Sequence, residues 1–600
     1  NISSHLLANF GLTYKLTNDL KLSGLIGITN FDSLLQNYIP TTIKPAGSSL
    51  IGIASLGNSQ NNSILYQLQA NYNKRFGKNH NLSGVLVGSA EEFVSKTQTA
   101  ASSGFTSNLT TFNSIQSGST PDVPNSSYTA NQLVSTVFRA SYNYKTLYYL
   151  SASGRYDGSS KFVDKEKYAF FPSLSAAWRI DQEEWFKKSL PIVSEFKLRG
   201  SWGLVGNQGI NPYSTVSTLG VASVVFGNQI NIGFAPNRLA NPELQWEKTS
   251  SVNLGTDLSF FKNRLSLTTE IYRKYTDGLL FNVTPPLTTG YNTYTKNIAS
   301  ISNMGVEYTL SGKILSKKDL SWSVDANIAF NTNTVEKLTG ATDEFLDINQ
   351  VGGTSYLYRI QPGKPIGQFF GYKSIGVWTD QTILTKPATF QVNVKEGARR
   401  YADLNNDGYL NNDDKVNLGS AIPKFFGGFS TNFSYKNLEL VAFFSYSVGN
   451  KIFNYYEITN NSLAGKNNLP KAIFDQRYRI ITPDMSPEEA QRVRANNEIT
   501  QVQVAGTVLD PRESTDYYIE DGSFLRCRDI TISYLLPEKW LKALGVSSLK
   551  TYVNVQNLFT ITKYSGYNPE VSSGSGLARG IDQGTTPVGR GFRFGLNANF

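Results

Sequence analysis

The sequence predicts an all-β fold in which amphipathic strands form a large antiparallel transmembrane β-barrel. Three observations predict this fold. Aromatic residues make up 12% of the chain and charged residues only 17%, a balance typical of strands rather than helices. Apolar and polar residues alternate in segments of about ten residues, the length that a tilted strand needs to cross a bilayer. Short connections alternate with long ones, as expected where turns lie on one side of a membrane and loops on the other.

The composition excludes several other classes of protein. Mean hydropathy is −0.28 and no run of about 18 apolar residues occurs, which excludes a helical membrane protein. The single cysteine, Cys527, excludes an intramolecular disulfide framework. Two histidines, His5 and His80, leave little for histidine-based catalysis or zinc binding. The 56 basic and 46 acidic residues are spread along the chain, so no nucleic-acid partner is expected.

Period-2 alternation predicts about 17 strands. In 249–259, for example, Val252, Leu254 and Leu258 face one way, while Ser251, Asn253 and Asp257 face the other. The predicted strands are 6–16, 20–31, 64–76, 82–93, 137–144, 148–156, 171–180, 196–204, 246–260, 264–274, 304–314, 320–330, 425–435, 438–448, 524–536, 551–561 and 591–600.

The predicted connections are of two kinds. The short ones are 17–19, 77–81, 145–146, 261–263, 316–319 and 436–437; the long ones are 32–61, 97–130, 207–245, 336–424, 451–517 and 562–590. A soluble β-sandwich or propeller would explain the strands but not this asymmetry between the two ends of the strands. Short periplasmic turns opposite long extracellular loops are typical of an outer-membrane barrel.

The C-terminus favours the same interpretation. Apolar side chains alternate up to the last residue, Phe600, and this pattern resembles the insertion signal of outer-membrane barrels. The alternative is an ordinary final strand, but soluble domains rarely end on one because termini fray. Complete bacterial barrels have an even number of strands that starts in the periplasm. We expect the last strand, and with it the C-terminus, to end in the periplasm. With an odd number of strands, the first strand would then start on the outer side of the membrane, so the chain would lack its first strands.

Several segments resemble the SusC/RagA group of TonB-dependent transporters of Bacteroidota, in family order over nearly the whole chain. The matching stretches are Arg155-Tyr-Asp-Gly-Ser-Ser-Lys-Phe162, Phe171-Pro-Ser-Leu-Ser-Ala-Ala-Trp-Arg179, Leu198-Arg-Gly-Ser-Trp-Gly-Leu-Val-Gly-Asn-Gln208, Asn241-Pro-Glu-Leu-Gln-Trp-Glu247, Asn303-Met-Gly-Val-Glu307, Asp403-Leu-Asn-Asn-Asp-Gly408, Gly522-Ser-Phe-Leu-Arg526, Gln556-Asn-Leu-Phe559 and Tyr564-Ser-Gly-Tyr-Asn-Pro-Glu570. Cys527, where the family usually has an apolar residue, and Asn568, where it often has Asp, depart from the pattern.

The resemblance implies a barrel of about 22 strands in the full protein, within the known range for outer-membrane barrels. It also implies import of large nutrients, either oligosaccharides or peptides, across the bacterial outer membrane. The implied partners are a SusD-like surface lipoprotein and TonB, which would act through an N-terminal region with a plug. That region and the first strands are expected to precede Asn1, so 1–600 would be an N-terminally incomplete barrel. Outer-membrane lipid and lipopolysaccharide would surround it.

The long connection 336–424 contains a calcium-type loop at 403–414. Asp403, Asn405, Asp407, the Tyr409 carbonyl, Asn411 and Asp414 stand at positions 1, 3, 5, 7, 9 and 12 of an EF-hand-type loop, with Gly408 at position 6. This spacing predicts a structural Ca²⁺ site that stiffens the connection. The alternative is a turn rich in Asn, Asp and Gly that holds no ion.

No catalytic residues are expected. The adjacent pairs Glu91 and Glu92, and Glu183 and Glu184, point to opposite faces of an extended strand and cannot share a site. Strand aromatics such as Tyr148, Tyr149, Trp178, Trp202 and Trp246 suit a membrane-interface girdle, strand packing or sugar stacking. Among the long connections, Tyr291, Tyr294, Tyr356 and Tyr358 are candidates for stacking on a sugar.

The sequence therefore predicts the barrel of a TonB-dependent importer and not an enzyme. The alternative is a barrel of the same family that serves as a structural or scaffold subunit of a secretion or assembly complex. A plug and a TonB-contacting segment upstream would favour import, and their absence would favour the scaffold. Loop composition does not identify the substrate.

Overall fold

The computed structural model describes all of the chain except 44–50, 228, 284, 292–293, 339–345, 349–356, 385–393, 461–467, 469, 501–513, 542–544 and 572–577. The chain divides into two compact units. The first comprises Asn1–Phe186, Lys197–Leu254 and Lys274–Ser300, and the second Lys187–Phe196, Gly255–Arg273 and Ile301–Phe600. Within the described residues, no helix has both the length and the apolar character needed to cross a membrane.

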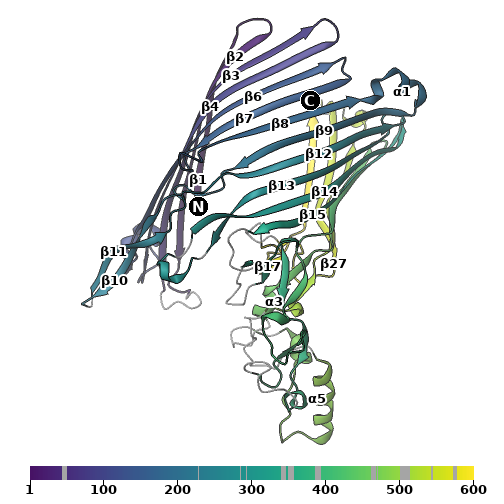
Figure 1. The fold of residues 1–600 in the computed structure, drawn as a ribbon. Coiled ribbons are helices and arrows are strands. Elements are labelled where there is room, and N and C mark those ends of the chain that lie inside the picture. Colours follow the sequence, from purple (N-terminus) through teal and green to yellow (C-terminus); the bar gives the residue numbers. More distant parts are fainter. Residues whose placement is uncertain are drawn as a thin grey trace. The chain divides into compact units, whose positions relative to one another are not determined.

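The first unit contains an antiparallel ladder in which strands pair in chain order (Figure 1). Its strands are β1 (Ile2–Lys15), β2 (Leu20–Ile39), β3 (Ile53–Phe76), β4 (His80–Ser103), β6 (Asn125–Tyr144), β7 (Tyr148–Ser159), β8 (Tyr168–Arg179) and β9 (Val193–Asn207). Strands β12 (Glu247–Phe260), β13 (Leu265–Val283) and β14 (Tyr294–Lys317) follow and contribute residues to both units. The predicted strands in this region are confirmed, and most are longer than expected.

The register gives the first ladder one polar and one apolar face. Partners across β4, β6, β7, β8 and β9 form a row of five serines, Ser83, Ser141, Ser151, Ser175 and Ser201. The next row, on the opposite face, is Leu82, Tyr142, Leu150, Ala176 and Gly200. Apolar side chains of that face are exposed, with Leu68 at 74% and Leu150 at 56%. In a bilayer this face contacts lipid, and pairing between neighbouring strands satisfies the backbone groups that lie between them.

Two bands of stacked aromatic rings mark the apolar face. Near the short connections, Tyr148 stacks between Tyr144 and Trp178, with ring centroids 6.5 and 6.2 Å away. Further along β7, Tyr156 stacks on Tyr168 at 5.5 Å. The eight residue steps from Tyr148 to Tyr156 cover about 26 Å of strand, or about 20 Å of height at a tilt of about 40°. This separation suits the two interface girdles of a membrane barrel.

Strands β3 and β4 have 24 residues each, about twice what a bilayer crossing needs. Beyond Ile64 the outward positions of β3 become polar, with Asn62 and Gln60, while its pairing with β4 continues. The prediction that 32–61 and 97–130 are wholly long connections was therefore wrong. Outside the lipid, both faces of the strand contact water, so its residues no longer alternate between apolar and polar. The backbone pairing continues there, although the sequence pattern that indicates a strand has ended.

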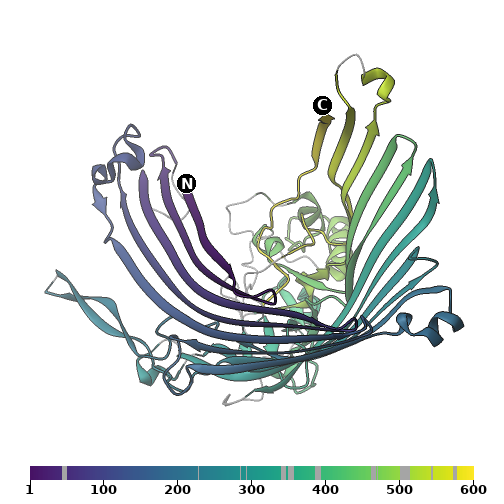
Figure 2. The ribbon, with the colours of Figure 1, turned by 90° about the horizontal axis from the view of Figure 1, so that it is seen from above.

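The second unit contains another antiparallel ladder, again paired in chain order. Its strands are β15 (Leu320–Leu338), β22 (Phe425–Tyr435), β23 (Leu438–Val448), β26 (Phe524–Leu535), β27 (Ser548–Thr562) and β29 (Gly591–Asn599). Figure 2 shows β1 at one margin of the first ladder and the C-terminal strand β29 at a margin of the second.

The short connections of each unit lie along one edge of its ladder. In the first unit the Asn73 amide donates to the Asp19 carbonyl at 2.8 Å, and the Lys145 amide to the Asn79 carbonyl at 2.7 Å. In the second, the Lys436 amide donates to the Asp319 carbonyl and the Ser547 amide to the Asn599 carbonyl, both at 2.7 Å. The C-terminus of the second unit therefore shares the edge of its short connections.

A β-bulge interrupts β26 at Arg528. Phe443 pairs with Asp529 and Phe444 with Cys527, so Arg528 is the additional residue. The bulge places Arg526, Arg528 and Asp529 on one face. There, both arginines form ion pairs with Glu570, and Arg526, only 2% exposed, donates to Asn568 at 2.8 Å. The Gly522–Arg526 and Tyr564–Glu570 stretches, distant in sequence, are joined by these contacts.

The long connections of the second unit pack into a small body with its own core. Leu357, Tyr358, Phe369, Ala421, Phe453, Ile458, Tyr518, Ala578 and Ile581 form this core, and they come from three different long connections. The short strands around this core are β17 (Tyr358–Ile360), β18 (Gln368–Gly371), β21 (Val416–Ser420), β24 (Lys451–Asn454), β25 (Ile519–Asp521) and β28 (Ile581–Asp582). The same connections also contain the strands β16 (Leu346–Ile348), β19 (Ser374–Val377) and β20 (Arg399–Tyr401). Their helices are α2 (Asp380–Leu384), α3 (Tyr455–Asn460), α4 (Lys471–Gln476) and α5 (Pro487–Ile499). Sequence reasoning treated these segments as separate loops and missed the body.

The assignment of faces can be tested with two adjacent residues of β3. Leu68→Trp should place an indole against lipid chains, whereas Gln67→Trp should place it on the polar face. Bromine-labelled lipid chains should therefore quench additional fluorescence in Leu68→Trp and not in Gln67→Trp, each compared with the parent's seven tryptophans. Equal quenching of both variants would contradict the assignment of faces.

Candidate substrate-facing wall and loop site

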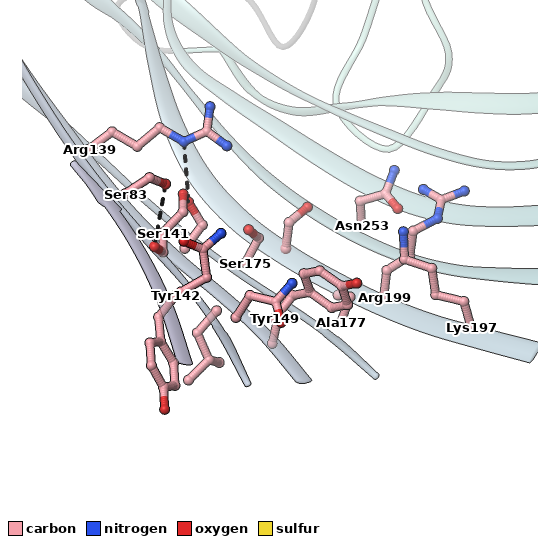
Figure 3. Close-up of a pocket in the computed structure, with 17 residues that line it drawn as sticks. Ser83, Arg139, Ser141, Tyr142, Tyr149, Ser175, Ala177, Lys197, Arg199 and Asn253 are labelled. Atoms are coloured by element: carbon pink, nitrogen blue, oxygen red, sulfur yellow. Dashed lines mark hydrogen bonds between the residues drawn. The ribbon is translucent and has the colours of Figure 1, made fainter. Parts of the chain in front are cut away.

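The polar face of the first ladder is hollowed near its short connections (Figure 3). The hollow has a volume of about 440 Å³ and is lined by serine, asparagine, tyrosine and basic side chains. Arg139 comes from β6, Lys197 and Arg199 from β9, and Asn253 from β12. Of the described residues that line it, none carries a carboxylate. The lining is therefore net positive.

The strand register explains this concentration of polar groups. In β4, β6, β7, β8 and β9 the lining polar side chains other than Tyr142 stand at odd-numbered positions, which the pairing brings to one face. Arg139 Nε donates to Ser151 Oγ at 3.3 Å, and Ser83 Oγ donates to the Ser141 carbonyl at 3.5 Å. Such a wall can bind hydroxyl, amide and anionic groups.

A second hollow, of about 710 Å³, lies further along the same strands. Beside it Phe162, Phe171, Ile210, Leu244 and Trp246 form a buried cluster with Ala169, and Trp246 Nε1 donates to the Lys167 carbonyl at 3.2 Å. The cluster joins four stretches that resemble the transporter family: 155–162, 171–179, 198–208 and 241–247. These residues fix the connections to the wall.

Gly206 shows how closely this cluster is packed. A Cβ at this position would lie 2.0 Å from the Phe171 ring, so a larger residue would displace the ring. Ser159 beside it is buried and donates a hydrogen bond to Gln208. These contacts give a structural role to the glycine and the glutamine of the 198–208 stretch.

The structure places the residues of the predicted calcium loop in one coil of chain. Asp403 accepts hydrogen bonds from the amides of Asn406 at 2.6 Å and Gly408 at 3.0 Å. Asp414, fully buried, accepts from the amides of Leu404 at 2.8 Å and Asn411 at 3.0 Å. The two carboxylates thus tie the start of the loop to its end.

The side-chain oxygens at the middle positions of the loop accept hydrogen bonds from backbone amides of the same loop. The Asn405 side chain accepts from the Asp407 amide at 3.0 Å, and Asp407 accepts from the Tyr409 amide at 2.8 Å. Asn411 caps the short 3₁₀ turn 412–414 by accepting from the Asp413 amide at 2.7 Å. In this arrangement the described residues contain no group of three or more His, Cys, Asp or Glu side chains that could hold a metal.

The aromatic residues that were candidates for a girdle or for stacking on a sugar lie in different environments. Tyr358 is 1% exposed and packs in the core of the second unit's small body, so the stacking hypothesis was wrong for this residue. Trp246 is 6% exposed and belongs to the buried cluster of the first unit. Tyr148 and Trp178 stack on each other in the aromatic band near the short connections, while Tyr149 lines the hollow. Tyr291 and Tyr294 lie in or beside strands, and Tyr356 lies outside the described residues.

Two buried tyrosines of the long connections, Tyr518 and Tyr564, have raised pKa values. Burial raises the pKa of Tyr518 to about 12. Burial, and then the hydrogen bond to Asp582, raises the pKa of Tyr564, whose hydroxyl donates to Asp582 Oδ2 at 2.6 Å. Both phenols therefore remain protonated at neutral pH and act structurally.

Sequence reasoning missed the basic hollow. Arg139, Lys197 and Arg199 lie on strands separated by about 60 residues, and only the pairing of β6 to β9 brings them to one wall. The available signal was the parity of the strands: all three residues have odd numbers, like the serines around them.

Comparison with known proteins identifies relatives along the whole chain. A family model described as "TonB dependent receptor-like, beta-barrel" matches residues 2–438. TonB-dependent receptor P3 of Formosa agariphila is 30% identical over 99% of this chain and 58% of its own length. TonB-dependent receptor SusC of Bacteroides thetaiotaomicron is 29% identical over 79% of this chain and 44% of its own length. The chain thus spans about half the length of these relatives.

Solved structures share the fold. The RagAB peptide transporter matches with a TM-score of 0.79 at 21% identity, over 100% of this chain and 62% of the matched chain. The "open-open" state of the RagAB peptide importer matches with a TM-score of 0.80 at 22% identity, over 100% and 61% of the two chains. These relatives are receptors and transporters, not enzymes, as predicted. The chain belongs to the TonB-dependent receptor family of outer-membrane β-barrels, in the group that resembles SusC and RagA.

Proposed function

We propose that the chain forms the barrel wall of a TonB-dependent importer of large nutrients, either oligosaccharides or peptides. The observation that carries the proposal is the continuous polar face of the first ladder, where hydroxyl, amide and basic groups line two hollows of about 440 and 710 Å³. Sugar rings and peptide bonds both present hydroxyl, amide or carbonyl groups that such a wall can bind. The names of the relatives, TonB-dependent receptor and peptide transporter, support the same class.

The proposal includes partners outside this chain. TonB would act through an N-terminal region that the longer relatives have room for, since the chain spans 58% of the length of receptor P3. A SusD-like surface lipoprotein would close the long-connection side. The short connections and the C-terminus would then face the periplasm, as in outer-membrane barrels generally. Outer-membrane lipid and lipopolysaccharide would surround the apolar face.

A protruding hairpin of the first unit is our candidate for the lipoprotein contact. Strands β10 (Thr218–Phe226) and β11 (Gln229–Arg238) form a separate two-stranded sheet. On one of its faces Val221 pairs with Phe234 and Val225 with Ile230, and these four side chains are 67–74% exposed. An isolated hairpin is marginally stable in water, and an exposed apolar face of this kind is typical of a docking surface.

We also propose that loop 403–414 binds Ca²⁺ as a structural ion. The ligands would be Asp403, Asn405, Asp407, the Tyr409 carbonyl, Asn411 and Asp414, the oxygen-rich set that Ca²⁺ prefers. The proposal is supported by the spacing and by the coil that Asp403 and Asp414 maintain through loop amides. The ion would neutralise three carboxylates in a small volume.

Import can be tested by growth. A strain that lacks the full-length transporter should fail to grow on one class among a panel of oligosaccharides and peptides as sole nutrient, and the parent gene should restore growth. The substrate class would be read from the lost growth. Equal growth of the deletion and parent strains on every nutrient would contradict import and favour a scaffold role.

The docking role of the hairpin predicts a partner-specific defect. Val221→Asp with Phe234→Asp should abolish copurification of the surface lipoprotein, because two charges would enter an apolar contact. Asn231→Asp with Gln229→Glu, on the opposite face of the hairpin, should leave copurification unchanged. Undiminished copurification by the first variant, with a barrel that still migrates as folded, would contradict the docking role.

The calcium proposal predicts a thermal shift. Calcium should raise the unfolding temperature of the parent transporter relative to chelator, and Asp403→Ala should remove that difference. Asp413→Ala is the matched control, because Asp413 lies in the same loop but not at a liganding position. A parent protein whose unfolding temperature is the same in calcium and chelator would identify the segment as a polar turn.

A further inference from the structure

The six connections of two to four residues between ladder strands are rich in basic residues. They are 16–19, 77–79, 145–147, 261–264, 318–319 and 436–437. With three flanking residues on each side, they contain eleven basic residues: Lys15, Lys21, Lys74, Arg75, Lys78, Lys145, Lys262, Arg264, Lys317, Lys318 and Lys436. They contain only three acidic ones, Asp19, Asp319 and Glu439, whereas the whole chain has 56 basic and 46 acidic residues. Basic residues therefore exceed acidic ones at the six short connections, whereas the longer connections at the same edge, 180–192 and 536–547, carry charges of both signs.

Three of these lysines lie over aromatic rings of the apolar face. Lys145 Nζ is 5.3 Å from the centroid of Tyr144, and Lys436 Nζ is 5.4 Å from that of Tyr435. Lys74 Nζ is 5.4 Å from the centroid of Phe76 and also forms a 3.5 Å ion pair with Asp19. The same arrangement thus occurs in both units, at three connections that are far apart in sequence.

The rings fix the depth of the charges in a membrane. Tyr144 belongs to the aromatic band that ends the lipid-facing surface, and such bands lie at the level of lipid headgroups. A lysine whose stem lies along one of these rings keeps its ammonium in the headgroup layer. The anionic group available at that depth is the lipid phosphate.

We propose that the short-connection edge of each unit binds the phosphates of anionic phospholipid, with Lys74, Lys145 and Lys436 as principal contacts. The inference rests on the proposed orientation, in which these connections face the periplasm and meet the phospholipid leaflet. A soluble acidic partner is less favoured by the geometry, because the lysine stems lie along lipid-facing rings rather than pointing along the strands.

The matched control is Lys96, on the long-connection half of β4. Its Nζ lies 5.8 Å from the centroid of Tyr128, so it has the same cation–π environment at the opposite end of the strands. Lys96→Gln and Lys145→Gln therefore remove the same charge from the same kind of contact. Lys145 lies at the short-connection edge, whereas Lys96 lies in the part of β4 that pairs with Gln60, beyond the lipid-facing positions of β3.

The test uses the full-length transporter, delipidated in detergent and titrated with phosphatidylglycerol or phosphatidylcholine under native mass spectrometry. The parent should bind phosphatidylglycerol more tightly than phosphatidylcholine. Each lysine removed should weaken phosphatidylglycerol binding by about fivefold, in Lys145→Gln and further in the triple variant of Lys74, Lys145 and Lys436. Lys96→Gln should bind it as the parent does.

Equal affinity of the parent for the two lipids would overturn the proposal. So would an equal loss in Lys96→Gln and Lys145→Gln, or selective loss of lipopolysaccharide binding in the triple variant, since that lipid occupies the other leaflet. The heat-dependent electrophoretic shift of a folded barrel would verify each variant. Because lipid binding and nutrient uptake are measured separately, failure here is distinguishable from failure of the proposed import function.

Discussion

The hydrocarbon core of a bilayer offers no hydrogen-bond partner to a peptide group, and this constraint determines most of the structure. Each strand that crosses the lipid must pair its N–H and C=O groups with neighbouring strands. Pairing along β1 to β9 and along β15 to β29 meets that requirement between neighbouring strands, with one bulge in β26. Once pairing is fixed, the pleat alone assigns each side chain to lipid or to the polar face. The serine row, the girdle and the basic hollow are consequences of that assignment.

Beyond the lipid the requirement is relaxed, and the chain uses ordinary globular packing. The small body of the second unit has a buried core around Phe369 and Phe453, with short strands and helices instead of a ladder. In the first unit, Trp246 and Phe171 hold two connections against the wall. The ion pairs of Arg526 and Arg528 with Glu570 do the same for β26 and the chain near Tyr564. Stretches that resemble the family therefore serve mainly to fix loops to strands.

Sequence reasoning was strongest where lipid imposes alternation. Strand 148–156, for example, lies within β7, and the asymmetry between short and long connections correctly indicated which strand ends share an edge. It was weaker where the alternation of apolar and polar residues disappears: Asn62 and Gln60 occupy the outward positions of β3 there, so the apolar side chains that mark a strand are missing from β3 itself. It also missed contacts that depend on three-dimensional packing. Tyr358 was interpreted as a surface residue because nothing local indicates a core assembled from three connections, and the grouping of Arg139 with Lys197 depends on register across four strands.

The bulge at Arg528 shows how such a wall can change in length during evolution. Inserting one residue into a regular strand would reverse the orientation of every side chain beyond it, exposing polar groups to lipid. In β26 the additional residue is accommodated locally: Leu525 and Cys527 precede it on the apolar face, and Ile530 and Ile532 follow on the same face. Insertions and deletions within the lipid-facing strands should therefore be tolerated only where a bulge restores the pleat, whereas the long connections can gain or lose whole segments. Such a barrel can therefore diversify through its loops while its membrane-spanning strands keep their length.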